Sequence, residues 1–191
     1  MTPHPEGGWF VRWYESGLKW VAPAASAADA TTSVPAPATP TAGIPAATPY
    51  PAGTERLAAT SIHYVLTGSR CSLHRLRADE LWYWHGGDPM VVVELTPDGV
   101  RQTVLGGDLA DGRQVQTLAV RGGTYFGSYL PAGSAWTYVS CAVVPGFDFA
   151  DWEMAGADAL AAAFPHAAHL IRVLAHDTAP PPPGALPLPL P

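Results

Sequence analysis

The feature that most restricts the fold of this chain is a series of short β-prone runs at nearly regular spacing. Each run is rich in β-branched and aromatic residues, and the breaks between the later runs hold the Gly, Pro and Asp residues of tight turns. About eight antiparallel strands of this length predict an all-β, double-sheet barrel or jelly roll. The runs are residues 9–14, 61–66, 71–76, 81–85, 90–95, 100–105, 116–120 and 136–144.

The pattern changes near the end of the chain. Residues 151–164 and 168–174 place apolar side chains at helical spacing, and Asp148 or Asp151 is suited to cap the first of these helices. The sequence therefore predicts a short C-terminal helical flank that covers one side of the barrel.

Two segments differ from the rest in composition. Residues 22–53 and 179–191 hold fourteen of the 21 prolines, and the remainder is mostly small residues that bury too little surface to offset the entropy of ordering. We expect the first to be a disordered insertion and the second a disordered tail. Residues 1–20 plus 54–178 then form a single domain.

Composition and charge exclude two classes of partner. The chain carries 10 Lys and Arg against 16 Asp and Glu, and no basic cluster of the kind that binds nucleic acid. It has no apolar run near the roughly 20 residues of a spanning helix and no basic-then-apolar leader, so we expect a cytoplasmic protein with no membrane contact. Cys71 and Cys141 lie in apolar runs and are interpreted as reduced core thiols.

One predicted strand and its neighbour carry the residues best suited to chemistry. Strand alternation puts Glu80, Trp82 and Trp84 on one face, and it puts His74 on the same face of its own strand as Ser72. A buried carboxylate needs a partner, and an indole N–H needs an acceptor. These residues therefore predict a wet cavity with aromatic walls, in which His74 and Glu80 contact each other or a ligand. His85 has the opposite parity and is expected outside the cavity.

Several motifs, taken in order, are similar to the branch of the cupin superfamily called cupin superfamily 5. The resemblance implies an antiparallel double-stranded β-helix around a small-molecule pocket. It covers nearly all of the predicted domain. The motifs are His4-Pro-Glu-Gly-Gly8, His74-Arg-Leu, Asp79-Glu-Leu-Trp82, Gly87-Asp-Pro89 and Cys141-Ala-Val-Val-Pro-Gly-Phe-Asp-Phe149.

Metal binding is what the cupin resemblance implies, and the departures from the cupin motif oppose it. If His74 is the first histidine of the motif, the second position holds Leu76. If His74 is instead the second histidine, the first position holds Ser72. The third histidine is replaced by Tyr125 or Phe126. Zinc and iron take about three or four protein ligands. We therefore expect no tightly bound metal and no other cofactor, with a weakly held divalent ion as the open alternative.

Three further residues are candidates for contact with substrate. Glu6 follows His4 and precedes two glycines, so it either caps a tight bend or enters the pocket. Arg12 stands where relatives carry an acidic residue, and it either lies on an exposed strand edge or offers the pocket a cation for an acidic ligand. Tyr125 stands where relatives carry Trp, and we expect it to help wall the substrate. In the motif that ends at Phe149 we prefer a structural role, in which the segment closes the barrel into the helical flank and Phe147 and Phe149 pack.

These features predict a small-molecule enzyme of the isomerase, epimerase or lyase kind that works without a metal. His74 or Glu80 would transfer the proton, and Ser72, Trp82, Trp84, Tyr125, Arg12 and Glu6 would bind the substrate. Deoxysugar epimerases of the same barrel type also work without a metal, an analogy at the level of the fold. The alternatives are a barrel that binds a metabolite without catalysis and a metal-dependent oxygenase. Relatives pair through strands, so we also expect a homodimer.

Overall fold

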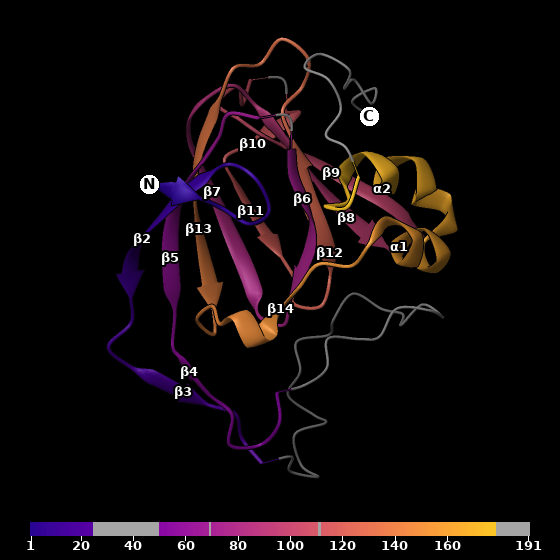
Figure 1. Ribbon diagram of the computed structural model, residues 1–191. Helices are drawn as coiled ribbons and strands as arrows, with labels where there is room; N and C mark the ends of the chain where they lie inside the picture. Colours follow the sequence, from indigo (N-terminus) through magenta and orange to yellow (C-terminus); the bar gives the residue numbers. More distant parts are fainter. Residues whose placement is uncertain (25–49, 69, 111, 179–191) are drawn as a thin grey trace.

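Two six-stranded sheets lie face to face in the computed structural model, which describes residues 1–24, 50–68, 70–110 and 112–178 (Figure 1). The described strand pairs are antiparallel except for β10 beside β9. The first sheet has the order β1 (Thr2–Pro3), β2 (Trp9–Glu15), β5 (Thr60–Leu66), β13 (Thr137–Val144), β7 (Asp79–Gly87), β11 (Thr117–Val120). The second has the order β10 (Gln114–Val115), β9 (Gly99–Leu105), β8 (Met90–Thr96), β12 (Tyr125–Tyr129), β6 (Arg70–Leu76), β14 (Trp152–Glu153). The predicted all-β, double-sheet class is confirmed.

The layer between the sheets is the main core, and it forms because strand alternation turns one apolar face of each sheet inward. Leu66, Met90, Phe126 and Val139 are among its buried members and come from both sheets. The eight predicted runs all coincide with observed strands to within a few residues. The prediction omitted β12, whose five residues are all buried.

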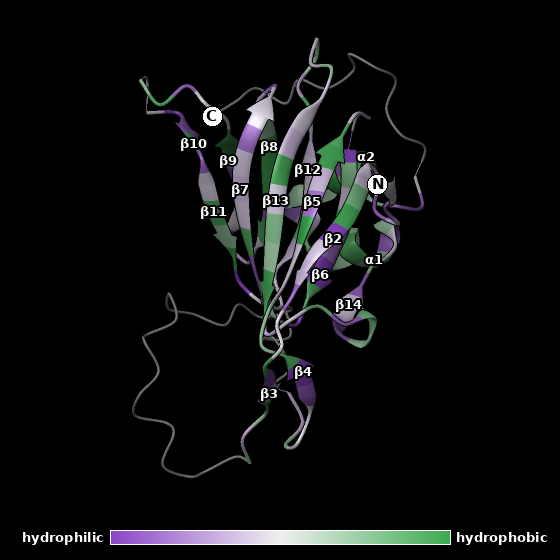
Figure 2. Cartoon of the chain, turned by 90° about the vertical axis from the view of Figure 1, so that its left-hand side faces the viewer, coloured by the Kyte–Doolittle hydropathy of each residue, from purple (hydrophilic) through white to green (hydrophobic). Residues whose placement is uncertain are grey.

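The short strands β3 (Lys19–Val21) and β4 (Glu55–Leu57) pair into a ribbon that extends from one end of the two sheets (Figure 2). Part of the predicted insertion, residues 25–49, lies outside the described residues, as does the whole predicted tail, residues 179–191. The placed ends of the insertion pack onto the ribbon: the Ala22 N–H donates to the Thr54 carbonyl at 2.9 Å, and the Tyr50 ring lies 5.0 Å from the Trp20 ring.

Two short helices and two 3-10 turns follow β13, and the helices cover the outer face of the second sheet. Leu160, Ile171 and Leu174 pack there against strand residues such as Leu73 and Val93. None of the helices in the described part of the chain is long and apolar enough to cross a bilayer. The elements are η2 (Phe149–Asp151), α1 (Ala157–Ala163), η3 (Pro165–Ala167) and α2 (Ala168–Leu174).

The helical flank is confirmed, but its first predicted helix, residues 151–164, is wrong in its first half. Trp152 and Glu153 pair with β6 as β14, and α1 begins only at Ala157. Asp148 does act as a cap, although for η2, where its carboxylate accepts the Ala150 N–H at 2.8 Å. The Ala157 N–H is instead satisfied by Asp177 at 3.0 Å.

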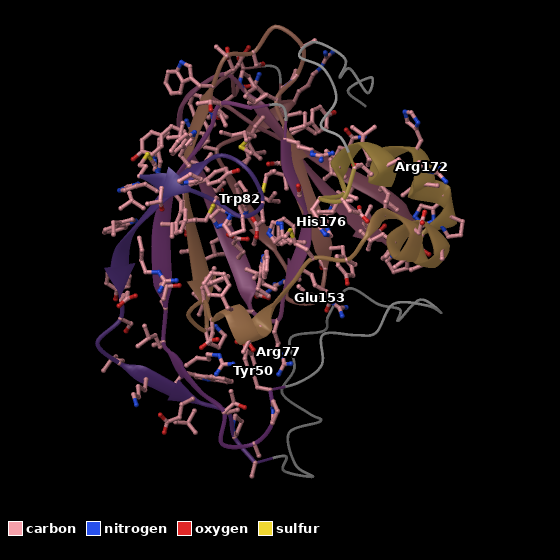
Figure 3. All side chains as sticks on the ribbon, in the orientation of Figure 1. Tyr50, Arg77, Trp82, Glu153, Arg172 and His176 are labelled. Atoms are coloured by element: carbon pink, nitrogen blue, oxygen red, sulfur yellow. The ribbon has the colours of Figure 1, made fainter. Side chains whose placement is uncertain are left out.

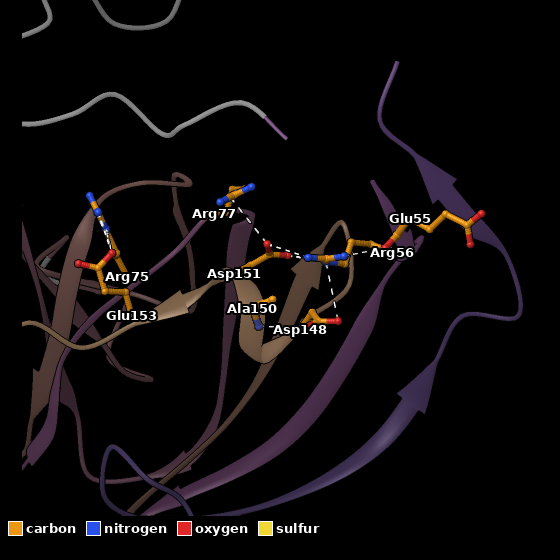
Figure 4. Close-up of polar contacts among 8 residues, drawn as sticks. All are labelled: Glu55, Arg56, Arg75, Arg77, Asp148, Ala150, Asp151 and Glu153. Carbon is orange, nitrogen blue, oxygen red and sulfur yellow. Dashed lines mark hydrogen bonds and ion pairs between the residues drawn. The ribbon is translucent and has the colours of Figure 1, made fainter. Parts of the chain in front are cut away.

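An ion-pair cluster fixes the segment between β13 and β14 (Figure 4). The Asp151 carboxylate accepts two hydrogen bonds from the Arg56 guanidinium, at 2.6 and 2.9 Å, and lies 3.7 Å from Arg77. Its side chain is 4% exposed, and bidentate pairing of this kind is geometrically specific. The cluster holds in place Phe147 and Phe149, which border the cavity described next.

Candidate functional site

A cavity of about 330 Å³ lies between the two sheets, and it runs from a buried end to an exposed mouth. Trp82 lies at its buried end, and Figure 3 places this residue between the sheets. Phe147 and Phe149 border the mouth, where Phe149 is 65% exposed. Their rings are 5.0 Å apart, so the predicted packing of these two residues is confirmed. The pair also forms part of the cavity wall.

Strand β7 carries the acidic and aromatic residues of the buried end. Its alternation is regular, with Glu80 and Trp82 buried and Tyr83 and His85 exposed. Glu80 and Trp82 therefore reach the cavity, as predicted, and His85 lies outside it on Ser140. Trp84 shares their face but lies beyond the end of the cavity.

The prediction that Trp84 lines the same cavity is wrong, because the cavity ends before this residue is reached along β7. The Trp84 ring instead covers Gly107, where an added Cβ would lie 2.8 Å from the indole.

Strand β6 contributes His74 and Cys71, not the predicted Ser72. The register with β12 shifts between the pairs Phe126 with His74 and Ser128 with Cys71, so β6 has one extra residue in this stretch. A β-bulge of this kind reverses the parity on one side. Cys71 consequently faces the cavity, while Ser72 uses its carbonyl oxygen to accept the His74 Nδ1–H at 2.8 Å.

Tyr125 is also outside the cavity. It is on the opposite face of β12 from Phe126 and packs in the layer beneath the helices, and its hydroxyl donates to Glu153 at 2.5 Å. Phe126 takes the inward position instead, with its ring 4.2 Å from the His74 imidazole. The prediction that Tyr125 helps to wall the substrate is therefore wrong, because strand parity turns this residue away from the cavity.

The loop before β2 brings Glu6 into the cavity and is itself tightly fitted. Gly7 and Gly8 have φ of +113° and +75°, and a Cβ on Gly7 would lie 2.6 Å from the Arg70 carbonyl oxygen. The loop is also bonded at two points: Ser72 N–H donates to the Glu6 carbonyl and the Tyr64 hydroxyl donates to the Gly7 carbonyl, both at 2.7 Å. Both interpretations of this motif therefore hold, because the two glycines form the tight bend and Glu6 lines the cavity.

The Glu6 carboxylate is the centre of a hydrogen-bond network. Its Oε1 accepts the Trp152 indole N–H at 2.5 Å, and its Oε2 accepts from the Cys71 thiol at 3.4 Å. The same Oε2 lies 3.4 Å from Nδ1 of both His74 and His4. Burial lowers the pKa of His4 and raises that of the Cys71 thiol, so both side chains favour their neutral forms.

Glu80 is in a different state from Glu6. Glu80 is only 7% exposed, and its Oε2 has no hydrogen-bond partner among the described residues. Burial, followed by the nearby Glu6 charge, raises the pKa of Glu80 to about 8. At pH 7 this side chain is therefore mainly a neutral acid that can donate a proton.

His74, in contrast to Glu80, can accept a proton. Since a carbonyl oxygen only accepts, the 2.8 Å contact with Ser72 places the His74 proton on Nδ1. In the neutral imidazole, Nε2 is then the unprotonated nitrogen and can accept a proton. The buried end of the cavity thus combines a proton donor, Glu80, with a proton acceptor, His74.

Arg12 lines the cavity at its mouth. Its guanidinium carbon lies 5.7 Å from the centroid of the Phe147 ring, and Nη1 donates to Glu15 at 2.8 Å. The arginine is therefore available to the cavity and is paired with an acid on the rim, rather than with Glu6 or Glu80.

The residues present do not fit the metal that the cupin resemblance implies. The inward position opposite His74 holds the Phe126 ring, and the bulge turns Ser72 away. Glu6, Cys71 and His74 do bring possible ligand atoms within 4.8 Å of one another. However, His74 is the one imidazole in this set, and burial raises the pKa of the Cys71 thiol and so disfavours the thiolate that binds a metal, which leaves the set short of the three or four ligands expected.

Several cavity residues were missed by reasoning from the sequence. Cys71 and Cys141 were correctly predicted as buried free thiols, but both also line the cavity. Tyr64 has the inward parity of its predicted strand, which is the sequence signal that identifies it as a cavity residue. Trp152 does not line the cavity, but its indole N–H donates to Glu6 from 146 positions away in sequence, and no local sequence pattern predicts such a contact.

Comparison with known proteins agrees with this architecture. A hypothetical protein from Leishmania major is 26% identical, with a TM-score of 0.72 over 92% of this chain and 93% of its own. A protein from Shewanella oneidensis is 28% identical, with a TM-score of 0.67 over 94% and 92%. No curated protein matches the chain. The sequence profile described as "Cupin superfamily (DUF985)" matches residues 1–155, and the chain therefore belongs to this family of cupins.

Proposed function

We propose that this cupin is a metal-independent enzyme that moves a proton on a small molecule, as an isomerase, epimerase or lyase. His74 acts as the base and Glu80 as the acid. The observation that carries the proposal is the buried Glu80 carboxyl, which lines the same cavity as His74 and whose Oε2 has no hydrogen-bond partner among the described residues. Perturbed pKa values cluster at functional sites, and a buried polar group without a partner needs an explanation of this kind.

The two side chains suit the deprotonation of carbon next to a carbonyl group. His74 Nε2 takes the proton as the C–H bond breaks, and the electron pair moves to the carbonyl oxygen. Protonated Glu80 donates to that oxygen and stabilises its charge. Return of the proton to the other face gives an epimer, return to another atom gives an isomer, and loss of a leaving group gives an elimination product.

The surroundings support this division of roles. The Ser72 carbonyl holds the His74 tautomer that leaves Nε2 free, and the Phe126 ring packs against the imidazole at 4.2 Å. Glu6 adds negative charge that keeps Glu80 protonated. Trp82 closes the buried end and limits access of water to the reacting groups.

Deuterium incorporation tests the proposal and does not require the substrate to be identified first. The full chain is incubated in D₂O with a protein-free extract of cell metabolites, and mass spectrometry identifies compounds that gain deuterium at carbon or are converted to an elimination product. We expect a discrete set of labelled compounds with the native protein. Glu80→Gln and His74→Gln should each slow the labelling by about 10²-fold or more.

Matched surface variants control for general effects of substitution. Glu55→Gln and His166→Gln change the same residue types at exposed positions away from the cavity and should label at the native rate. Retention of a co-purified ligand without any labelling would instead indicate a binding protein. Labelling that survives Glu80→Gln and His74→Gln would refute the assigned roles.

A further inference from the structure

We propose that the ligand of this cavity is a small organic acid whose carboxylate binds Arg12 at the mouth while a neutral carbonyl or hydroxyl group reaches Glu80. The inference rests on the proposed function and adds a substrate class to it. It depends on how Arg12 is positioned, on how loosely it is paired, and on how charge is distributed along the cavity.

A bulge in β2 leaves Arg12 facing the cavity. Arg12 pairs with Ile62 and Tyr14 with Ser61, so Trp13 is an extra residue in the strand. Phe10 and Arg12 face inward, while Trp13 is 58% exposed on the outer face. The Phe147 ring, 5.7 Å from the guanidinium carbon, supports the arginine on the apolar rim.

The partner of Arg12 can be displaced by a ligand. Glu15 lies three residues away on the same strand, and its side chain is 56% exposed. Exposed ion pairs of this type contribute little to stability, because both charges are also well solvated by water. A ligand carboxylate can therefore replace Glu15, and the planar guanidinium can then bind both of its oxygens.

The distribution of charge orients such a ligand. Arg12 is the one Arg or Lys among the cavity-lining residues in the described part of the chain. The buried end contains the Glu6 carboxylate, which would repel a second anion there. Asp148, beside the mouth, faces Arg56 at 3.9 Å. An anionic group is therefore favoured at the mouth, and a neutral hydrogen-bond acceptor is favoured at the protonated Glu80.

A matched pair of probes isolates the carboxylate. Mandelate and its neutral amide, mandelamide, have nearly the same shape, and each carries an aromatic ring and a hydroxyl group. Dissociation constants at pH 7 can be obtained from NMR titration of the full chain. We expect the native protein to bind mandelate about tenfold more tightly than mandelamide, in line with one charge-assisted contact.

Substitutions at the two members of the ion pair should act in opposite directions. Arg12→Ala should remove the preference for mandelate, and Arg12→Lys should restore only part of it. Glu15→Gln should strengthen mandelate binding about two- to threefold, because it removes the internal competitor. A purely structural role for the ion pair predicts that Arg12→Ala and Glu15→Gln weaken mandelate binding alike.

Three outcomes would overturn the inference: no binding of mandelate by the native protein, equal affinity for mandelate and mandelamide, or an unchanged preference in folded Arg12→Ala. Phenyl phosphate serves as a further arm, and tighter binding of it than of mandelate would overturn the choice of a carboxylate. These results concern binding alone. A failure of deuterium labelling with the mandelate preference intact would remove the proposed reaction and leave the ligand class standing.

Discussion

Replacing Glu80 by Gln should change the pH dependence of stability in a defined direction. The pKa of Glu80 is about 8 in the folded protein, against 4.5 as its ordinary value. Between these values the folded state holds a proton that the unfolded state has released. The native protein must therefore lose stability as the pH rises from 4.5 to about 8, and this loss is complete above the folded pKa.

The size of the effect follows from the same two values. Each pH unit within the window costs about 1.4 kcal/mol, which gives a ceiling of about 5 kcal/mol over the whole range. The cavity opens to solvent at Arg12, and water that solvates the ionised carboxylate reduces the penalty. We expect about 2–3 kcal/mol. A glutamine at this position is neutral at every pH, so the variant should lack this loss.

Urea denaturation of both proteins at pH 5, 6, 7, 8 and 9, followed by tryptophan fluorescence, gives the test. The free energy of unfolding of Glu80→Gln minus that of the native protein should rise by about 2–3 kcal/mol from pH 5 to pH 9. Other titrating groups cancel in this difference. Glu55→Gln, at an exposed position, should give a flat difference. A flat difference for Glu80→Gln would refute the assignment of a buried, protonated acid.

Three further predictions concern the frame around the site. Gly8→Ala should lower the free energy of unfolding by about 2–3 kcal/mol, because φ is +75° and the new Cβ would lie 2.6 Å from the Tyr64 hydroxyl; Gly17→Ala, with open space around it, should change little. Protein purified without chelator should carry well under one equivalent of metal by mass spectrometry, whereas a full equivalent lost in Glu6→Gln would contradict the metal-independent proposal. We also propose a homodimer through the outer face of the first sheet, where Trp13 is 58% exposed. Light scattering should then give twice the chain mass at micromolar concentration and Trp13→Ser should weaken the dimer, while a monomer mass for the native protein would oppose it.

The strands and the acidic face of the cavity could be predicted because they depend on local pattern. Alternation with a period of two is a property of neighbouring residues, so Glu80 and Trp82 could be assigned to one inward face before their surroundings were known. The same rule placed His85 outside. Trp84 marks its limit, since parity indicates the face a residue occupies but does not show how far a cavity extends along that face.

The residues that were misplaced or missed depend on contacts far away in sequence. Cys71 replaces Ser72 in the cavity because β6 bulges opposite Gly127, where an added Cβ would lie 2.9 Å from the Cys71 carbonyl oxygen. The predicted helix over residues 151–164 begins late because Trp152 pairs with β6 instead of continuing a helical turn. In each case a partner strand decides the local conformation, and residue propensity does not.

The hydrogen bond between Glu6 and Trp152 has a consequence for how the protein acquires its binding capacity. The two residues are 146 positions apart, so the Glu6 side chain depends on a donor that is synthesised 146 residues after it. A nascent chain that ends before Trp152 leaves the Glu6 carboxylate without its strongest donor. Ligand recognition should therefore arise only when synthesis of the domain is almost finished, and a small molecule cannot help the earlier stages of folding by binding to this cavity.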